Sequence, residues 1–235
     1  MKYILIIKEF LTMLASKRYQ IDKLTYKTHN FHLYKGYDSQ KEQPSFFKIV
    51  ADGNYPQKRL KQEYEIAKSL QGLNGVANFY DRISYQDRVG LVFNYFAGQL
   101  LANIIKQQEF SVEYFLNLAI KLTELLGKIH ENNIIHRNLK STAILVNQTE
   151  NELKLFDLSS ALPSKHLEGN EVERNNRIIN LAYSAPEAVG RTEQSTDYRS
   201  DIYSLGVIFY ELLTSRLPFI VKDKAKLLHF HLAKE

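Results

Sequence analysis

A change in hydrophobic periodicity near Gly98 limits the folds that this chain can adopt. Before it, short β-prone runs alternate with turn residues, and only residues 59–70 place apolar side chains at helical spacing. After it, two long stretches, residues 112–132 and 201–214, have the amphipathic spacing of helices. The pattern predicts an α+β fold in which a small, sheet-rich lobe precedes a larger, helical lobe.

The strand-like runs lie in the first part of the chain, at residues 31–34, 45–50, 76–83 and 89–93. The helix at residues 59–70 is expected to stop at Gly72, since glycine readily takes the left-handed conformation that ends helices. We place the connector between the lobes at residues 94–98. The predicted boundaries are therefore residues 19–96 for the first lobe and 97–235 for the second.

Composition excludes several classes of protein. With 235 residues, of which 44% are hydrophobic, the chain can bury a substantial core. It contains no cysteine, which excludes disulfides and thiol nucleophiles, and a reducing, cytoplasmic location is the default expectation. The net charge is +5, but the lysines and arginines are scattered among acidic residues. This pattern favours a surface of mixed charge over a nucleic-acid interface.

The first 18 residues resemble a leader segment. An apolar run at residues 3–7 is interrupted by Lys8 and Glu9, long before the roughly 20 apolar residues that a membrane span requires. Apolar side chains then return at residues 10–14. We expect residues 1–18 to form a leader helix that packs on the domain and not a membrane anchor; a leader from an incorrectly assigned start codon is the alternative.

A series of short motifs follows in a fixed order along the chain. They are Phe47-Lys48-Ile49, Glu63, His136-Arg137-Asn138-Leu139-Lys140, Asp157-Leu158-Ser159, Ala185-Pro186-Glu187 and Asp201-Ile202-Tyr203-Ser204-Leu205-Gly206. The series resembles the signature of eukaryotic-type Ser/Thr protein kinases. The resemblance implies a bilobal protein kinase-like fold that uses ATP and Mg²⁺, although the replacements described below would weaken its affinity for them.

Two further sequence segments resemble those of a bacterial group of very large signalling proteins. They occupy residues 62–66 and 197–201. In that group a kinase-like domain precedes an ATPase-like module and a sensor histidine kinase. The resemblance therefore implies a protein partner or downstream domains of a larger signalling protein. It also implies that the second lobe is incomplete, because the usual arginine partner of Glu187 comes from later helices.

The resemblance assigns roles to individual residues. Lys48 would hold the ATP phosphates, Glu63 would fix that lysine, and Asp157 would bind magnesium. Lys140 belongs to the catalytic loop. The implied adenine-binding residues are Leu33, Phe46, Asn94, Phe96 and Leu145.

Two replacements fall within the catalytic loop. Asn138 stands where the family has the aspartate that accepts the proton of the substrate hydroxyl, and an amide is not a base. Such groups contribute roughly 10²–10⁴-fold to the rate. Ala143 stands where the family asparagine binds the second magnesium, and a methyl group offers no oxygen ligand. The alternative is drift at tolerated positions in a slow but working enzyme.

The predicted nucleotide site is altered as well. The three glycine positions of the phosphate-covering loop are occupied by Tyr26, Thr28 and Phe31. Phe46, two residues before Lys48, replaces a small residue above adenine, and its ring either fills the adenine space or packs into the first lobe. Three functions follow: a catalytically impaired regulatory or nucleotide-binding module (a pseudokinase), a weak Ser/Thr kinase, or a non-binding remnant.

Overall fold

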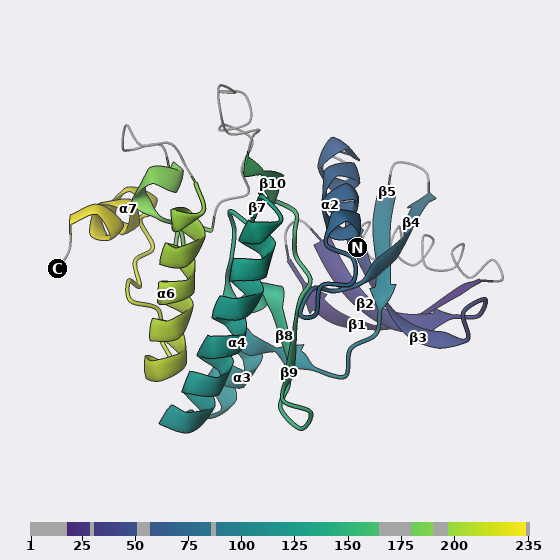
Figure 1. Ribbon diagram of the computed structural model, residues 1–235, viewed down its shortest axis with the longest axis horizontal. Helices are drawn as coiled ribbons and strands as arrows, with labels where there is room; N and C mark the ends of the chain where they lie inside the picture. Colours follow the sequence, from purple (N-terminus) through teal and green to yellow (C-terminus); the bar gives the residue numbers. More distant parts are fainter. Residues whose placement is uncertain are drawn as a thin grey trace. The chain divides into compact units, whose positions relative to one another are not determined.

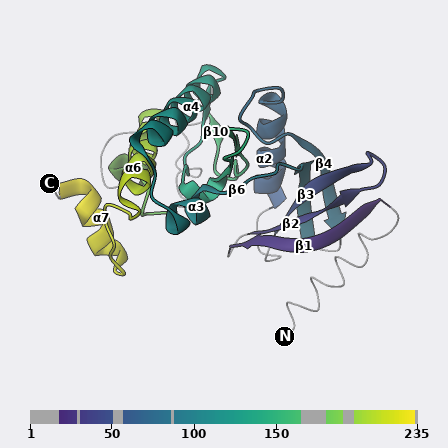
Figure 2. The same cartoon turned by 90° about the horizontal axis from the view of Figure 1, so that it is seen from below.

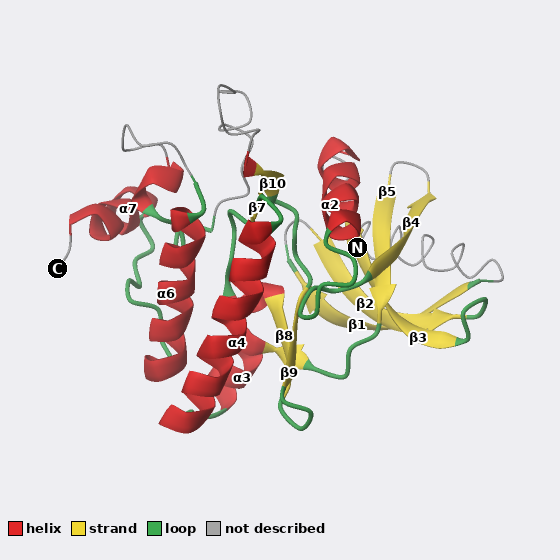
Figure 3. Cartoon of the chain, in the orientation of Figure 1, coloured by secondary structure: helices red, strands yellow, loops and turns green. Residues whose placement is uncertain are grey.

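The computed structural model describes residues 18–28, 31–50, 57–85, 88–164, 180–189 and 197–233 (Figure 1). Apart from Arg18, the predicted leader helix lies outside the described residues. The chain divides into two compact units. The first runs to Gly72 and includes Ala77–Ala97, and the second comprises Leu73–Val76 and the chain from Gly98 onward. Colouring by secondary structure shows a sheet-rich first unit and a largely helical second unit, which confirms the α+β fold class (Figure 3).

The first unit is a five-stranded antiparallel sheet with one helix. Its strands are β1 (Tyr19–Lys27), β2 (Phe31–Asp38), β3 (Gln43–Val50), β4 (Phe79–Tyr85) and β5 (Arg88–Asn94), in the order β1-β2-β3-β5-β4. The helix α2 (Gln57–Ser69) contacts β4 and β5 (Figure 2). It ends three residues before Gly72, whose φ of 87° fits the predicted helix stop. The strand predicted from residue 76 begins only at Phe79, because Val76 instead bridges to Leu155.

The two faces of this sheet carry different side chains. Residues directly opposite one another on antiparallel strands share a face. One face is a hydrophobic cluster formed by Tyr19, Tyr34, Phe47, Ile49, Ile83 and Val92. The pairs Leu33 with Lys48, Phe46 with Phe93 and Lys48 with Leu91 place the predicted nucleotide-contacting side chains on the other face.

Gly36 in β2 is explained by close backbone approach. A Cβ atom at this position would lie 2.2 Å from the carbonyl oxygen of Gln20 and 2.8 Å from a ring carbon of Phe47. No real Cβ contact is that short, so any side chain here would push β1 away from β2. The glycine therefore serves strand packing and not phosphate binding.

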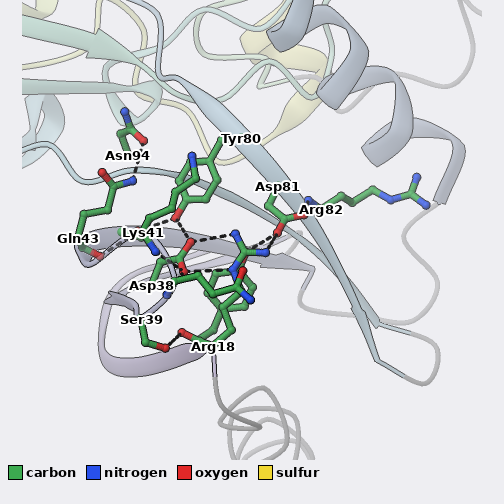
Figure 4. A network of polar contacts seen from close by, with 12 residues as sticks. Arg18, Asp38, Ser39, Lys41, Gln43, Tyr80, Asp81, Arg82 and Asn94 are labelled. Atoms are coloured by element: carbon green, nitrogen blue, oxygen red, sulfur yellow. Dashed lines mark hydrogen bonds and ion pairs between the residues drawn. The ribbon is translucent and has the colours of Figure 1, made fainter.

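A polar network joins the beginning of β1 to the β2–β3 turn and to β4 (Figure 4). The guanidinium of Arg18 donates to both carboxylate oxygens of Asp38, each at 3.1 Å, and to Asp81 at 2.8 Å. The Asp38 carboxylate, which is fully buried, also accepts from the Tyr80 hydroxyl and from two backbone N–H groups of the turn. Burial opposes its charge, but these hydrogen bonds outweigh that cost and lower its pKa.

The second unit combines helices with short strands. Its longer helices are α3 (Leu101–Gln107), α4 (Val112–Glu131), α6 (Arg199–Thr214) and α7 (Lys224–Ala233), and its short 3₁₀ helices include η1 (Ser141–Ala143) and η3 (Pro186–Val189). Its strands β6 (Gln99–Leu100), β8 (Ile144–Asn147) and β9 (Glu152–Leu155) form one sheet, and β7 (Ile134–Ile135) pairs with β10 (Leu162–Pro163). None of the described helices is long and apolar enough to cross a lipid bilayer.

Helices α4 and α6 lie side by side in opposite directions (Figure 1). Ser111 begins α4 by accepting a hydrogen bond from the backbone N–H of Tyr114 at 3.2 Å. The rings of Phe115 and Phe209 meet edge to face near one end of the pair, and His130 contacts Asp201 near the other. The start of α6 is therefore held next to the segment that follows α4, where the predicted catalytic loop lies.

We predict that Asp38→Asn lowers the free energy of unfolding by about 2–3 kcal/mol, because it leaves buried donors without the carboxylate that they bind. Asp197→Asn is the matched control, since Asp197 makes a similar contact with Arg199 at the surface. That change should cost about 1 kcal/mol or less. Chemical denaturation followed by circular dichroism measures both, and equal effects would contradict a structural role for the Arg18 network.

Candidate functional site

The sheet-rich unit forms the predicted ion pair between Lys48 and Glu63. The Nζ atom of Lys48 in β3 lies 2.6 Å from Oε1 of Glu63 in α2, and both side chains are buried. Glu63 points inward because the buried positions of α2 recur at Leu60, Glu63, Ile66 and Leu70, which share one side of a helix. The fold thus places the carboxylate against the lysine without distorting either element.

The same ammonium also lies against an aromatic ring. Lys48 Nζ is 4.3 Å from the ring centroid of Phe31, a cation–π distance. Phe31 begins β2 and occupies one of the three predicted glycine positions. The sequence showed only that this position lacks a glycine. The register of β2 against β3 is needed to see that the ring of Phe31 contacts Lys48.

The residues predicted to surround adenine lie mostly in the first unit. Phe46 is buried, with its ring centroid 5.4 Å from that of Phe93 and 5.1 Å from that of Tyr95. The backbone N–H of Asn94 donates to the carbonyl of Asn78 at 3.2 Å. Leu33 is fully buried on the same face as Lys48. The ring of Phe46 is therefore packed among other aromatic rings of its own unit.

The two other residues predicted to contact adenine, Phe96 and Leu145, belong to different units. Phe96 is half-buried in the segment that follows β5. Leu145 belongs to the second unit, where it is buried in the middle of β8 and pairs with Leu100 and Lys154.

In the second unit, one carboxylate holds the predicted catalytic loop. Asp201, in the first turn of α6, accepts hydrogen bonds from the backbone N–H groups of His136 at 2.8 Å and Arg137 at 2.7 Å. It also contacts Nε2 of His130 at 2.9 Å. Arg137 has a φ of 65°, which is uncommon for a residue with a side chain, and the hydrogen bonds of Asp201 stabilise this conformation. Asp201 therefore holds the backbone of this loop through its side chain.

The loop brings the retained and the replaced residues together. Lys140 Nζ lies 3.4 Å from Oδ2 of Asp157, whose carboxylate is buried. Asn138 is buried, and its backbone N–H donates to Nδ1 of His136 at 3.3 Å. Ala143, at the end of η1, is fully buried and its carbonyl accepts from the N–H of Phe156, next to Asp157. The loop is therefore held by backbone hydrogen bonds on both sides of Lys140.

A contact that sequence reasoning missed joins the same loop to α6. The hydroxyl of Tyr183 lies 2.9 Å from Oγ of Ser141 and donates to Glu211 at 2.6 Å. Burial and the Glu211 charge raise the pKa of Tyr183, so the phenol stays neutral. The motif that begins at Ala185 marks this region of the sequence, but no pattern there indicates that Tyr183 reaches Glu211.

The neighbouring polar side chains satisfy local groups. The amide oxygen of Asn180 accepts from the N–H of Ala182 at 3.2 Å. Glu187 accepts a hydrogen bond from the hydroxyl of Ser200 at 2.7 Å.

The side chains present fit the predicted cofactors only in part. The Asp157 carboxylate can hold a magnesium ion, because hard cations prefer oxygen ligands. Ala143 supplies no ligand for a second ion, and the ammonium of Lys48 already faces Phe31 and Glu63.

Comparison with known proteins agrees with this geometry. A family model described as the protein kinase domain matches residues 32–234. A probable serine/threonine-protein kinase of Clostridium perfringens is 33% identical over 164 residues, which make up 69% of this chain and 23% of that protein. The serine/threonine-protein kinase PrkC of Bacillus subtilis is 28% identical over 180 residues, or 76% of this chain and 27% of PrkC.

A third relative carries a different description. The hybrid signal transduction histidine kinase G of Dictyostelium discoideum is 28% identical over 206 residues, which cover 59% of this chain and 6% of that protein. The chain spans less than a third of the length of each of these three relatives.

The buried histidine of the loop makes stability depend on pH. Burial lowers the pKa of His136 below its ordinary value, although the charges of Asp201 and Asp157 act in the opposite direction. The unfolded chain therefore binds a proton more readily than the folded chain, and stability falls as pH drops below the unfolded value of about 6.5. We predict a lower melting temperature at pH 5.5 than at pH 7.5.

The contribution of His136 is isolated by substitution. His136→Phe should reduce the difference in melting temperature between the two pH values. His231, whose pKa is also lowered by burial, is replaced by Phe in a parallel variant to measure its share. A pH difference that both variants leave intact would show that other groups cause it.

Proposed function

This chain belongs to the protein kinase family, with a domain of the eukaryotic Ser/Thr type, and we propose that it acts as a pseudokinase, a signalling domain with impaired phosphate transfer. The observation that carries the proposal is the presence of Asn138 and Ala143 in a catalytic loop whose backbone is otherwise held in place. Lys48, Glu63 and Asp157 are retained. Chemical groups are missing from the loop, while its scaffold is intact.

Asn138 affects the proton transfer step. A carboxylate at this position would accept the proton of the substrate hydroxyl as the oxygen attacks the phosphate. The amide of asparagine has the same shape but does not accept a proton at neutral pH. Because Asp201 fixes the neighbouring backbone, the side chain at position 138 still has a defined place. The defect is therefore one of chemistry, worth roughly 10²–10⁴-fold in rate.

Ala143 affects the stabilisation of charge. Magnesium ions neutralise the charge that develops on the transferred phosphate, and the family asparagine helps to hold one of them. The methyl group of Ala143 is fully buried and has no oxygen to offer. A carboxylate at Asp157 alone would leave the second ion without this ligand. The two replacements impair different parts of one reaction, which favours a strong loss over a mild one.

A binding or regulatory role agrees with what the chain keeps. We propose that the domain works in the cytoplasm and signals through contacts with a protein partner or with further domains of a larger protein. The greater length of its relatives supports this proposal, as does the description of one of them as a hybrid signal transduction histidine kinase.

The second candidate function is weak Ser/Thr kinase activity. It is favoured by the short contact of Lys48 with Glu63 and by the proximity of Lys140 to Asp157. These groups would position ATP and one magnesium ion, and solvent would take the proton of the substrate hydroxyl. The two candidates differ in one measurable quantity, the rate of phosphate transfer.

We predict that the purified chain transfers no more phosphate from labelled ATP than its Lys48→Ala variant does, with Mg²⁺ or Mn²⁺ and long incubation. Autophosphorylation and a general protein substrate are both assayed, and the kinase domain of PrkC serves as the active control. A clear rate in the wild type that disappears in Lys48→Ala would exclude the pseudokinase proposal and establish the weak kinase.

A further inference from the structure

We propose that Phe31 is a built-in cover on Lys48 and that its ring sets the affinity of this domain for nucleotides. The inference rests on the proposed function, since it concerns the same lysine, but it assigns a role to the side chain that stands at one of the family's glycine positions. The ring lies where the ammonium would otherwise be open to the phosphates of a nucleoside triphosphate. Nucleotide binding then requires Phe31 to move.

The position of Phe31 at the start of β2 is fixed by hydrogen bonds with Thr28. The hydroxyl of Thr28 donates to the carbonyl of Phe31 at 2.8 Å and accepts from its N–H at 2.9 Å. The backbone N–H of Thr28 also donates to the Phe31 carbonyl at 2.9 Å. Three hydrogen bonds with Thr28 thus hold the backbone of Phe31, whereas a glycine at this position would leave the backbone free to approach phosphates.

The side chain of Phe31 is held as well. It is 5% exposed, and its ring packs near Tyr26 with centroids 6.3 Å apart. Phe31 and Lys48 belong to adjacent strands with Leu33 directly opposite Lys48, so the ring reaches the ammonium across the strand pair. The hydrogen bonds to its backbone and the packing of its ring on Tyr26 both hold Phe31 in this position.

The charge of Lys48 explains why a ring suits this position. A buried ammonium needs compensation for the water that it has lost. Glu63 supplies one partner at 2.6 Å, and the electron-rich face of Phe31 supplies another at 4.3 Å. Phosphate oxygens would need to approach the same ammonium. The ring therefore competes with the nucleotide for Lys48 by occupying space and by satisfying its charge.

A second ring at the adenine end provides a comparison. Phe46 lies on the same face of β3 as Lys48 and packs on Phe93 and Tyr95. If the block to binding lay at adenine, removal of Phe46 would relieve it, whereas a block at the phosphates would be relieved by removal of Phe31.

The test is the affinity of the full chain for Mg²⁺–ATP, measured by isothermal calorimetry on the wild type and three variants. Phe31→Gly removes the ring and installs the family residue, Phe31→Leu keeps an apolar cover without a π face, and Phe46→Ala opens the adenine end. We expect Phe31→Gly to bind about tenfold more tightly than the wild type, as expected for loss of one cation–π contact. Phe31→Leu should lie between them.

Three results would overturn the inference: equal affinity in the wild type and Phe31→Gly, Phe31→Leu binding as tightly as Phe31→Gly, or a gain in Phe46→Ala alone. Thermal unfolding followed by circular dichroism shows whether each variant folds. If Phe31→Gly does not fold, a gain in affinity of Phe31→Leu over the wild type carries the test, and its absence rejects the cover. Phosphate transfer by the wild type would overturn the pseudokinase proposal without affecting this comparison of affinities.

Discussion

Lys48 and Glu63 bring opposite charges into the interior of the sheet-rich unit, with their charged atoms 2.6 Å apart. Burial of each charge costs several kcal/mol, and that cost is offset only while both are present in good geometry. The pair therefore joins α2 to β3, because a shift of the helix would leave two charges uncompensated. Apolar replacements of buried ion pairs are often neutral or stabilising, so we interpret this pair as fixing one arrangement of helix and sheet and not as a source of stability.

In the second unit, the residues that hold the loop in place differ from those at the predicted reactive positions. Asp201 binds the backbone of His136 and Arg137, and Tyr183 connects Ser141 to Glu211. None of these contacts involves the side chains of positions 138 or 143. The loop can therefore hold an asparagine and an alanine at those positions and keep its path. This independence explains how reactive groups can be replaced in a fold whose motifs remain easy to recognise.

The sequence predicted the features that depend on local pattern. Periodicity located α2, α4 and α6 to within about two residues, and the order of the motifs predicted that Glu63 would pair with Lys48. Helix α7 was missed because its apolar residues are spread around the helix and form no single stripe.

Other features depend on register and long-range contact. The cover of Phe31 on Lys48 requires knowledge of which residues of β2 and β3 are opposed. The Arg18 network requires three segments to meet, the last at Asp81. The pattern of a single sequence does not show which distant segments come into contact.

The replacements in the two units bear on a single reaction, although each unit shows them separately. In the first, the ring of Phe31 lies against Lys48, and in the second, Asn138 and Ala143 stand where the family resemblance implies a base and a metal ligand. A slow enzyme would still need Lys48 to be open to its substrate. The π face of Phe31 gives the ammonium a second partner within the chain, in addition to Glu63. Through these contacts, side chains of the chain itself hold α2 against β3, which agrees with the proposed role in binding.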